Sequence, residues 1–333
     1  MNHGRAVRYT DSGGTEVIEL TEHPIPSPGP GQLLVQVKAC GLNRADILQR
    51  LGYYPAPKGA PADIPGLEFA GRVAECGQGA TLFSPGDPIM GIAAGGAMAT
   101  HILVHEREAI PAPSGMDLTV AAAIPEVFMT AYDALCIQAK MRPGEVVLIH
   151  SVGSGVGTAA IQIASAFGAT VVGSSRTNSK LERCMAIGLE HPVLAQDGQF
   201  LPQLKDMGIK ANVILDTVGA AYLQQNIRAL TEKGRLVVIG LMGGATGSAS
   251  LGLLLTKRAT IIGSVLRSRP LEEKCTLAQS FAREILPFFE CGRFKPVIEK
   301  QFPMEQIQEA HALMESNQSF GKIVLEWNED STQ

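Results

Sequence analysis

Apolar runs of strand length alternate with longer helix-like segments through the middle of the chain. The strand-like runs lie at residues 146–150, 170–174, 212–216, 235–240 and 259–265. Strands that are apolar on both faces are typical of a parallel sheet that helices cover on both sides. The pattern therefore predicts a doubly wound α/β domain in this part of the chain.

The pattern changes toward the N-terminus. Before about Ala123 the chain is rich in Gly and Pro, and its short β-like runs lie at 32–38, 69–75 and 99–104. Such a pattern is typical of a β-rich lobe. At 333 residues the chain is long enough for two domains, since about 150 residues is a common domain size.

The pattern changes again after Arg269-Pro270. Helix-like segments at 271–290 and 304–316 alternate there with strand-like runs at 297–302 and 322–327. We expect these C-terminal elements to return to the β-rich lobe.

The run from Val146 to Gly157 combines a strand with a glycine-rich turn. Its sequence is VVLIHSVGSGVG, and a helix-like segment follows from Thr158 to Phe167. Glycine lets the backbone turn sharply and approach a phosphate, and the free N–H groups at a helix start favour negative charge. A second apolar strand at 170–173 completes the βαβ context that this signal needs. The turn is therefore predicted to bind the pyrophosphate of a dinucleotide.

The residues after the second strand indicate which dinucleotide is bound. Domains that prefer NAD carry an acidic residue there, which accepts hydrogen bonds from the ribose hydroxyls. In this chain the segment has no acid and contains Ser175, Arg176, Thr177 and Lys180. Hydroxyl and cationic side chains can bind the additional phosphate of NADPH, so NADPH is the expected cofactor. In the alternative interpretation, the two cations are ordinary solvated charges of a loop.

Composition and charge argue against nucleic acid and membranes as partners. Charged residues make up 18% of the chain and the formal net charge is −4, so there is no basic excess of the kind that nucleic-acid binding requires. No apolar run is long enough to cross a bilayer, and the first residues lack the apolar core of a secretory signal. We therefore expect a cytoplasmic protein with a small-molecule substrate.

Cysteine and histidine show no catalytic or metal-binding spacing. The six cysteines are scattered without a CxxC pair, which favours reduced thiols in the core. None of four histidines has an acid or nucleophile at an interpretable spacing, and we expect no catalytic role for His101, His105, His150 or His311.

Several motifs in order carry a family resemblance. They are Asn43-Arg-Ala-Asp46, Pro65-Gly-Leu-Glu68, Thr130-Ala131, the glycine turn and Leu241-Met-Gly-Gly244. With these motifs, the chain resembles the quinone oxidoreductase group of the medium-chain dehydrogenase/reductase superfamily over nearly everything from Val17 to Glu326. Within that group it resembles the tumour-suppressor-inducible NADPH-dependent branch through three blocks, Asn43-Arg-Ala-Asp-Ile-Leu-Gln-Arg50, Ala122-Ala-Ile-Pro-Glu126 and Leu266-Arg-Ser-Arg269.

The resemblance implies an α/β fold with two domains. A GroES-like, β-rich catalytic domain would combine residues 1–124 with residues 268–333. A Rossmann domain with a doubly wound parallel sheet, at 125–267, would bind NADPH.

Two positions argue against zinc. The zinc alcohol dehydrogenases of this superfamily have a metal-binding cysteine where this chain has Asn43, and a metal-binding histidine where it has Leu67. Leucine cannot coordinate a metal and asparagine replaces thiolate poorly, so no metal site is expected. Without a Lewis acid, the chemistry suits acceptors that are already electrophilic, such as quinones or conjugated carbonyl compounds.

The resemblance also assigns candidate catalytic residues. Asn43 and Tyr54 are expected to donate hydrogen bonds to the oxyanion that develops on the acceptor, and Tyr53 is expected to contribute. In the alternative interpretation, the two tyrosines are packing or lid residues. Asp46 is expected to cap the helix after Asn43 or to brace the loop.

Further residues are expected at the cofactor by resemblance alone. The pyrophosphate would lie at Ser154, Gly155, Val156 and Gly157, and Thr130 would lie near the nicotinamide. Main-chain contacts to the nicotinamide are expected from Gly240, Leu241, Met242, Ser264, Val265 and Leu266. Asn317 and Lys322 match positions close to the cofactor, although Lys322 is equally well interpreted as a strand-edge charge.

The sequence thus predicts a zinc-independent, NADPH-dependent oxidoreductase acting on quinones or conjugated carbonyl compounds. The alternatives are an enoyl or alkenal reductase and a non-catalytic NADPH-binding protein. By resemblance, a homodimer is expected through the last strand of the Rossmann sheet, 259–265.

Overall fold

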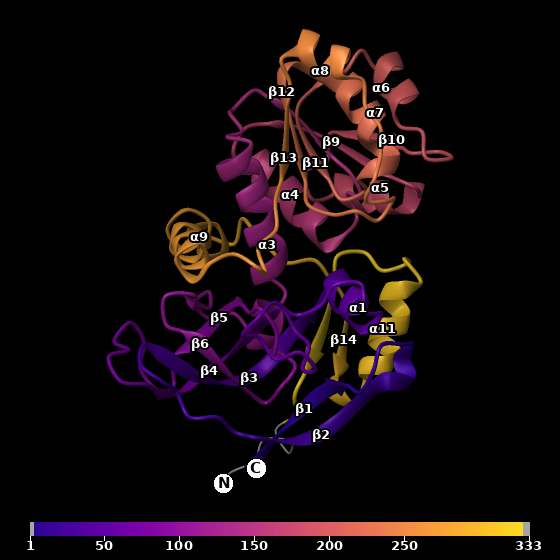
Figure 1. The fold of residues 1–333 in the computed structure, drawn as a ribbon. Helices are drawn as coiled ribbons and strands as arrows, with labels where there is room; N and C mark the ends of the chain where they lie inside the picture. Colours follow the sequence, from indigo (N-terminus) through magenta and orange to yellow (C-terminus); the bar gives the residue numbers. More distant parts are fainter. Residues whose placement is uncertain (1–2, 329–333) are drawn as a thin grey trace. The chain divides into compact units, whose positions relative to one another are not determined.

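A computed structural model describes residues 3–328, which form two compact units. We call the unit that combines the residues up to Met129 with those from Leu266 onward the terminal unit, and Thr130–Val265 the central unit. Figure 1 shows the ribbon of both units and labels most of their helices and strands.

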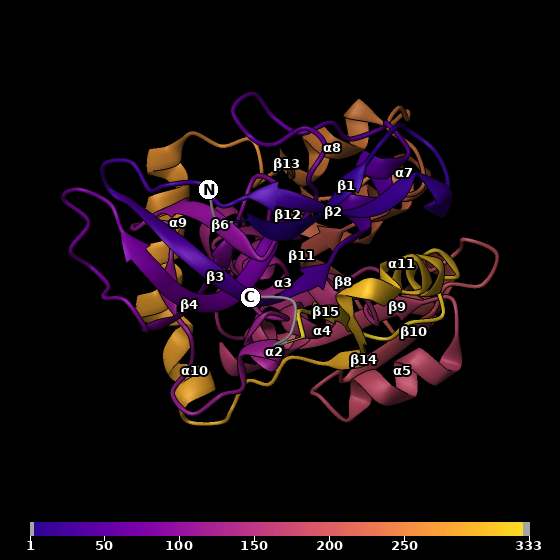
Figure 2. The same ribbon diagram turned by 90° about the horizontal axis from the view of Figure 1, so that it is seen from below.

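The terminal unit is built on a seven-stranded sheet. Its order is β14-β15-β3-β4-β5-β7, and β6 also pairs with β3. The strands are β3 (Gln32–Leu42), β4 (Glu68–Cys76), β5 (Pro88–Ile92), β6 (His101–His105), β7 (Ile110–Pro111), β14 (Ile298–Pro303) and β15 (Lys322–Glu326). Figure 2 shows β3 and β4 side by side. Since β15 runs antiparallel to β3, the predicted return of the C-terminal elements to the first lobe is confirmed.

Shorter elements complete the terminal unit. A two-stranded hairpin consists of β1 (His3–Tyr9) and β2 (Ile18–Pro24), with a 3-10 turn (Thr15–Val17) between them. The helices are α1 (Arg44–Arg50), α2 (Leu118–Ala121), α9 (Leu271–Glu284), α10 (Leu286–Glu290) and α11 (Ile307–Glu315), the last preceded by a 3-10 turn (Met304–Gln306). Apolar side chains of the sheet, such as Phe69, are buried in one core together with Trp327, which directly follows β15.

The prediction of one continuous helix at 271–290 is wrong. The structure has two helices there, and they meet at Ile285. Pro287 has no backbone N–H and so cannot continue the hydrogen-bond ladder of the first helix.

The central unit contains a six-stranded, fully parallel sheet in the order β10-β9-β8-β11-β12-β13. The strands are β8 (Val146–Ile149), β9 (Thr170–Ser175), β10 (His191–Leu194), β11 (Ala211–Asp216), β12 (Leu230–Val238) and β13 (Thr260–Gly263). The sequence analysis did not predict β10, which contains Pro192. A proline is tolerated there because β10 lies at the edge of the sheet.

Helices connect these strands. They are α4 (Gly155–Ala166), α5 (Asn178–Met185), α6 (Leu201–Asp206), α7 (Ala220–Ala229) and α8 (Leu251–Lys257), while α3 (Pro125–Tyr132) and a π-helical turn (Asp133–Gln138) lead into the unit. The strand order reverses between β8 and β11. Right-handed crossovers then place helices on both faces, so the predicted doubly wound sheet is confirmed.

Candidate active site

The turn after β8 has the geometry of a phosphate-binding turn. Ser154 is the N-cap of α4, and its Oγ accepts a hydrogen bond from the Gly157 N–H at 3.1 Å. A Cβ at Gly157 would lie 2.4 Å from the Val152 carbonyl oxygen, so the close approach of helix and turn requires glycine. The start of this 12-residue helix suits an anionic group. The residues present therefore fit a dinucleotide pyrophosphate.

Other predicted residues gather at the same edge of the sheet, because parallel strands end together. After β12, a Cβ at Gly240 would be 2.9 Å from the Thr217 carbonyl oxygen, and the Met242 N–H donates to that oxygen at 3.2 Å. After β13, the Ser264 N–H donates to Val238 O at 3.0 Å. The side chains of Leu241 and Met242 are exposed, which leaves an open surface at this edge.

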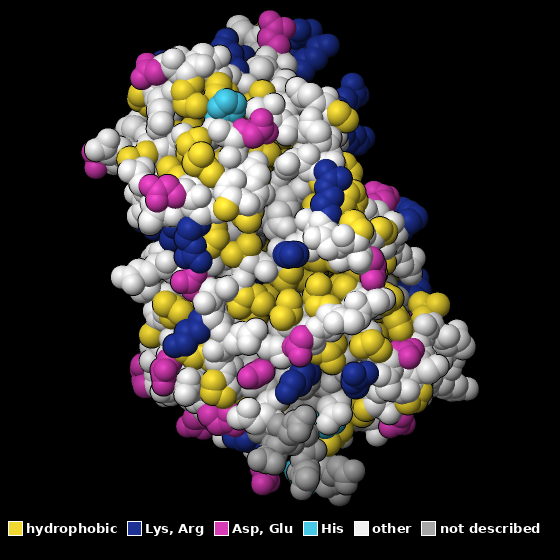
Figure 3. Space-filling view, turned by 180° about the vertical axis from the view of Figure 1, so that it is seen from behind, with side chains coloured by type: hydrophobic (Ala, Val, Ile, Leu, Met, Phe, Trp, Pro, Cys, Tyr) yellow, Lys and Arg dark blue, Asp and Glu magenta, His cyan; other side chains and the backbone are white. Residues whose placement is uncertain are grey.

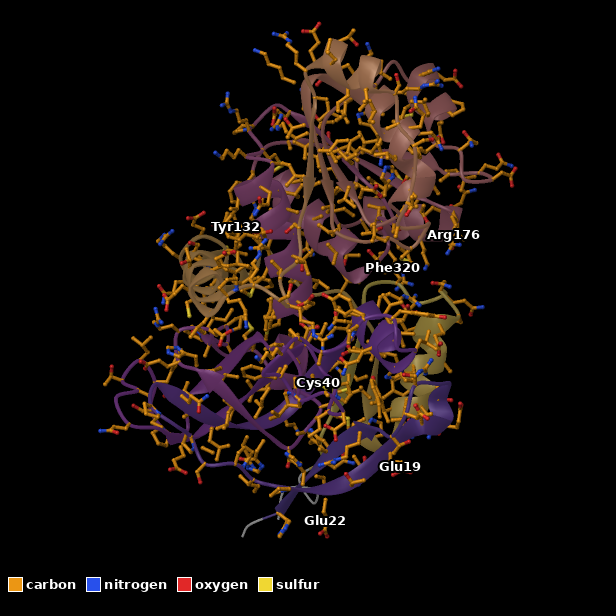
Figure 4. The ribbon with its side chains drawn as sticks, viewed as in Figure 1. Glu19, Glu22, Cys40, Tyr132, Arg176 and Phe320 are labelled. Carbon is orange, nitrogen blue, oxygen red and sulfur yellow. The ribbon has the colours of Figure 1, made fainter. Side chains whose placement is uncertain are left out.

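The segment predicted to choose the cofactor follows β9. Ser175 is buried at the end of the strand, and its Oγ accepts a hydrogen bond from the Thr177 N–H at 3.3 Å. Arg176 is exposed, and Figure 4 labels it where β9 leads into α5. Lys180 lies half-buried in α5. Hydroxyl and cationic groups are thus close in sequence at the strand end, as phosphate recognition requires.

A buried polar chain supports these strand ends. The fully buried His150 contacts Ser174 Oγ through Nδ1 and Asn226 Oδ1 through Nε2, both at 2.7 Å. Asn226 Nδ2 donates to Asp216 Oδ2 at 3.0 Å. Burial lowers the pKa of His150 to about 4, so the ring is neutral near pH 7. A neutral ring has one N–H, and Asn226 Oδ1 can only accept, so Nε2 donates and Nδ1 accepts from the serine.

In the terminal unit, Lys322 forms a buried ion pair. Its Nζ donates to Glu68 Oε1 at 2.6 Å, Asn43 Oδ1 at 2.8 Å and Leu42 O at 2.8 Å. An ammonium group has three donors, and all three are used here. Both partners of the ion pair are buried, so Lys322 is not a solvated strand-edge charge.

The amide of Asn43 is also fully engaged. Its Nδ2 donates to Gly41 O at 3.1 Å and to Glu68 Oε1 at 2.9 Å, while Oδ1 accepts from Lys322. An amide has only two N–H donors. Asn43 would therefore have to release one of these hydrogen bonds before it could donate to an acceptor molecule.

Asp46 has the structural role that the sequence predicts. Its Oδ2 accepts from the Asn43 N–H at 2.8 Å at the start of α1, and its Oδ1 accepts from the Gly66 N–H at 3.1 Å. Burial raises the pKa of this carboxyl group to about 6, against the effect of these hydrogen bonds.

The two adjacent tyrosines differ in environment. Tyr53 is 78% exposed, whereas Tyr54 is half-buried. Among the described residues, the Tyr54 hydroxyl forms no hydrogen bond. Burial raises its pKa, so the hydroxyl keeps its proton near pH 7 and can donate it in a hydrogen bond.

Sequence reasoning missed two charged residues near these groups. Arg267 is 5% exposed, and its guanidinium lies over the Tyr54 ring, 5.2 Å from the ring centre. Glu126, at the start of α3, donates from its backbone N–H to Glu68 Oε2 at 2.8 Å. Burial, and then the charge of Glu68, raises the pKa of its carboxyl group to about 8. Both lie in motifs that carried the resemblance, but nothing local in the sequence predicts their partners.

The remaining predicted residues are dispersed. Thr130 and Val265 are the first and last residues of the central unit, and Leu266 is buried in the terminal unit. Asn317 has a positive φ of 58°, and its Oδ1 accepts from Arg44 Nη2 at 2.7 Å.

The described residues also bear on metal binding, cysteine pairing and membrane spans. Within residues 3–328, no cluster of three or more His, Cys, Asp or Glu side chains could hold a metal ion. All six cysteines are free thiols, and Cys40, labelled in Figure 4, is fully buried in β3. In the same part of the chain, no helix is both long and apolar enough to span a membrane.

Two family models match the chain. An alcohol dehydrogenase GroES-like domain matches residues 29–114, and a zinc-binding dehydrogenase domain matches residues 155–282.

Comparisons with individual proteins cover nearly the whole chain. It is 31% identical to human quinone oxidoreductase over 326 residues, which is 96% of this chain and 97% of the relative. It is 28% identical to the mouse synaptic vesicle membrane protein VAT-1 homolog, covering 96% of this chain and 83% of that one.

Solved structures have the same fold. A quinone oxidoreductase from Pseudomonas syringae superposes with a TM-score of 0.87 at 25% identity, covering 97% of this chain and 99% of that one. The CurK enoyl reductase superposes with a TM-score of 0.84 at 26% identity, again covering 97% and 99%.

Proposed function

Since the chain belongs to the quinone oxidoreductase group of the medium-chain dehydrogenase/reductase superfamily, we propose that it uses NADPH to reduce quinones or related conjugated carbonyl compounds without zinc. The family and the two-domain fold, GroES-like and Rossmann-like, imply an oxidoreductase with a nicotinamide cofactor. The choice of NADPH, the acceptor and the independence from zinc are our inferences from the site.

The choice of NADPH rests on the segment from Ser175 to Lys180, which follows β9, the strand next to β8 and its glycine-rich turn. Backbone N–H groups at the start of α4 would hold the pyrophosphate. Arg176 and Lys180 would pair with the additional phosphate, with Ser175 and Thr177 as hydroxyl donors. No acidic residue in this segment offers the ribose contact typical of NAD sites. When bound, the cofactor would supply the hydride.

The proposal of zinc-independent chemistry is supported by Lys322. The two ligand positions of zinc relatives hold Asn43 and the buried Leu67, and the nearby carboxylate of Glu68 is already paired with Lys322. A metal ion here would lack thiolate and imidazole ligands and would compete with an ammonium group. We expect elemental analysis of the purified protein to find no stoichiometric zinc and EDTA to leave its activity unchanged. Loss of activity with the chelator, restored by zinc, would contradict this.

Tyr54 is the candidate that fits acceptor chemistry best. Its hydroxyl has no protein partner among the described residues, whereas both amide hydrogens of Asn43 are engaged. We infer that Tyr54 donates a hydrogen bond to the acceptor oxygen as negative charge develops there. Asn43 would then shape the site through its contacts with Lys322 and Glu68, and the exposed Tyr53 would cover the acceptor.

The central experiment measures turnover of one quinone with NADPH and with NADH, and of one conjugated enal with NADPH. We expect quinone reduction with NADPH to be fastest. Faster reduction of the enal would favour an enoyl or alkenal reductase, a candidate supported by the similarity to the CurK and JamJ enoyl reductases at 26% identity. Binding of NADPH without turnover of either acceptor would instead indicate a binding protein, and absence of NADPH binding would overturn the proposal.

We also propose that the protein forms a homodimer through β13. This strand lies at one edge of the parallel sheet, and Ile261 within it is 40% exposed. In the neighbouring α8, Leu251 and Leu255 are each 76% exposed. A second copy would cover these apolar side chains and pair the free strand edge. Light scattering should give twice the chain mass, and Ile261→Lys should give the monomer.

We also predict the kind of partner and the cellular location of the protein. On the face drawn in Figure 3, Lys and Arg side chains are interspersed with Asp and Glu, a distribution that does not favour nucleic acid. We expect a small-molecule substrate and a cytoplasmic location.

A further inference from the structure

We infer that Arg267 is the positioning residue for Tyr54, holding its loop in place and keeping a positive charge against its ring. This inference rests on the proposed role of Tyr54 in acceptor reduction. All of the contacts that carry it lie within the terminal unit.

The guanidinium of Arg267 joins three separate segments. Its Nε donates to Ala94 O at 2.7 Å, its Nη1 to Tyr54 O at 3.2 Å and its Nη2 to Gln49 Oε1 at 2.6 Å. These acceptors belong to the loop after β5, the loop after α1 and α1 itself. A planar fork with donors in fixed directions suits such a three-way contact, whereas lysine offers a single point of charge.

Gln49 connects Arg267 to a second point of the loop that contains Tyr54. Its Nε2 donates to Ala62 O at 3.1 Å, near the far end of the loop that contains Tyr54. Arg267 therefore holds the loop directly at Tyr54. Gln49 holds it at Ala62, and the side-chain carbonyl oxygen of Gln49 is in turn fixed by Arg267. Both side chains are buried. The loop is thus preorganised, although its tyrosine side chain remains partly accessible.

Arg267 is a buried cation whose hydrogen-bond acceptors are all neutral. Its three hydrogen bonds reach neutral oxygens, and Arg267 forms no ion pair with any of the residues that the structure describes. Carboxyl groups of Asp46 and Glu126 and the hydroxyl of Tyr54 interact with it electrostatically at longer range. Its positive charge is therefore not cancelled by a paired carboxylate.

This charge acts on the Tyr54 hydroxyl. The guanidinium lies 5.2 Å from the ring centre, and it opposes the rise in the phenol pKa that burial causes. A cation over an aromatic face interacts favourably with the ring, and more so when desolvated. A more acidic phenol is a stronger hydrogen-bond donor to an oxygen that becomes negative. Arg267 would therefore favour acceptors, such as quinones, whose oxygen takes up charge.

The inference is tested by a double-mutant cycle. We expect Arg267→Met to lower kcat for a quinone by roughly 10- to 100-fold in the wild-type background, and by less than about 3-fold in the Tyr54→Phe background, because coupled residues are not additive. The dissociation constant for NADPH should stay within about 2-fold of the wild type in every variant, since Arg267 acts at the acceptor. Equal losses of kcat in both backgrounds would overturn the inference.

Arg267→Lys keeps the positive charge and loses the fork. We expect its kcat to fall between the wild type and Arg267→Met. Arg235→Met is the matched control, because Arg235 is a half-buried arginine in the central unit that pairs with Glu145 at 2.7 Å. It should lower thermal stability without the background-dependent loss of kcat.

A second readout does not need catalysis. With ring-labelled tyrosine, only five residues give NMR signals, and Tyr54→Phe identifies one of them. We expect the phenol titration of Tyr54 to move to higher pH in Arg267→Met and to stay near the wild type in Arg267→Lys. An unchanged titration would overturn the inference even if no quinone is reduced, whereas a shifted titration in an enzyme without quinone activity would remove only the proposed function.

Discussion

Lys322 and Glu68 form an ion pair at 2.6 Å in which both side chains are almost completely buried, 4% and 0% exposed. The pair joins β15 to β4, although the two residues are 254 positions apart in the chain. Transfer of two charges from water into an interior is costly, and only their mutual attraction and further hydrogen bonds offset it. Asn43 and Leu42 supply those further hydrogen bonds.

Removing either partner of this pair should therefore be strongly destabilising. We expect Lys322→Met or Glu68→Gln alone to lower the free energy of unfolding by about 3–5 kcal/mol, because one charge is left buried without a partner. The double variant should lose less than the sum of the two. Denaturant unfolding followed by fluorescence of Trp327, the only tryptophan in the chain and buried in the same unit, measures each value.

The control for this prediction is an exposed ion pair. Arg258 and Glu232 lie 2.6 Å apart with side chains 60% and 70% exposed. Breaking that pair should change stability by less than about 1 kcal/mol. Additive effects of the two buried variants would mean that Lys322 and Glu68 contribute independently.

The preference for NADPH should depend on the residues after β9. Arg176→Ala and Lys180→Ala are each expected to weaken NADPH binding roughly 10-fold, and NADH binding by less than about 2-fold, because a charge-assisted hydrogen bond to the additional phosphate is lost. Calorimetry with both nucleotides measures the difference. Lys205→Ala, an exposed lysine of α6 in the same unit, should change neither affinity. If both nucleotides weaken equally, these cations do not recognise the additional phosphate.

His150 should make the protein less stable in mild acid. Its pKa is lowered by burial to about 4 in the folded state, against 6.5 for an ordinary histidine. Between these values the unfolded chain binds a proton and the folded chain does not, so the free energy of unfolding falls as pH decreases from about 6.5 to 4. The full effect is about 3 kcal/mol.

The test compares His150→Gln with the wild type by urea unfolding, followed by circular dichroism across this pH range. The variant should lose less stability on acidification, since glutamine does not titrate. Parallel pH profiles of the two proteins would show that His150 is not the group responsible.

Glu126 should have the opposite effect at higher pH. Its pKa is raised to about 8 from 4.5 by burial and by the charge of Glu68. The folded state therefore keeps a proton that the unfolded chain has lost, and the free energy of unfolding falls as pH rises from about 4.5 to 8. In Glu126→Gln this decline should be smaller. A decline of the same size in the variant would place the titration on another group.

Local pattern was sufficient for much of the fold. Gly157, Ser154 and the apolar run of β8 predict a strand, a glycine-rich turn and a helix, and the structure has all three. The motif blocks predict the family, which the comparisons confirm. The exact limits of the domains and the roles of the site residues stay predictions.

Longer-range contacts decided what the sequence by itself left open. The sequence determined where strands, turns and the glycine-rich helix start lie, because these depend on residues within a few positions of each other. It did not determine that Lys322 neutralises Glu68, that the amide of Asn43 is fully engaged, or that Arg267 holds Tyr54, because each pairing joins residues far apart in the chain. Whether a polar side chain is free to act on a substrate depends on those distant partners, and only the tertiary structure brings them together.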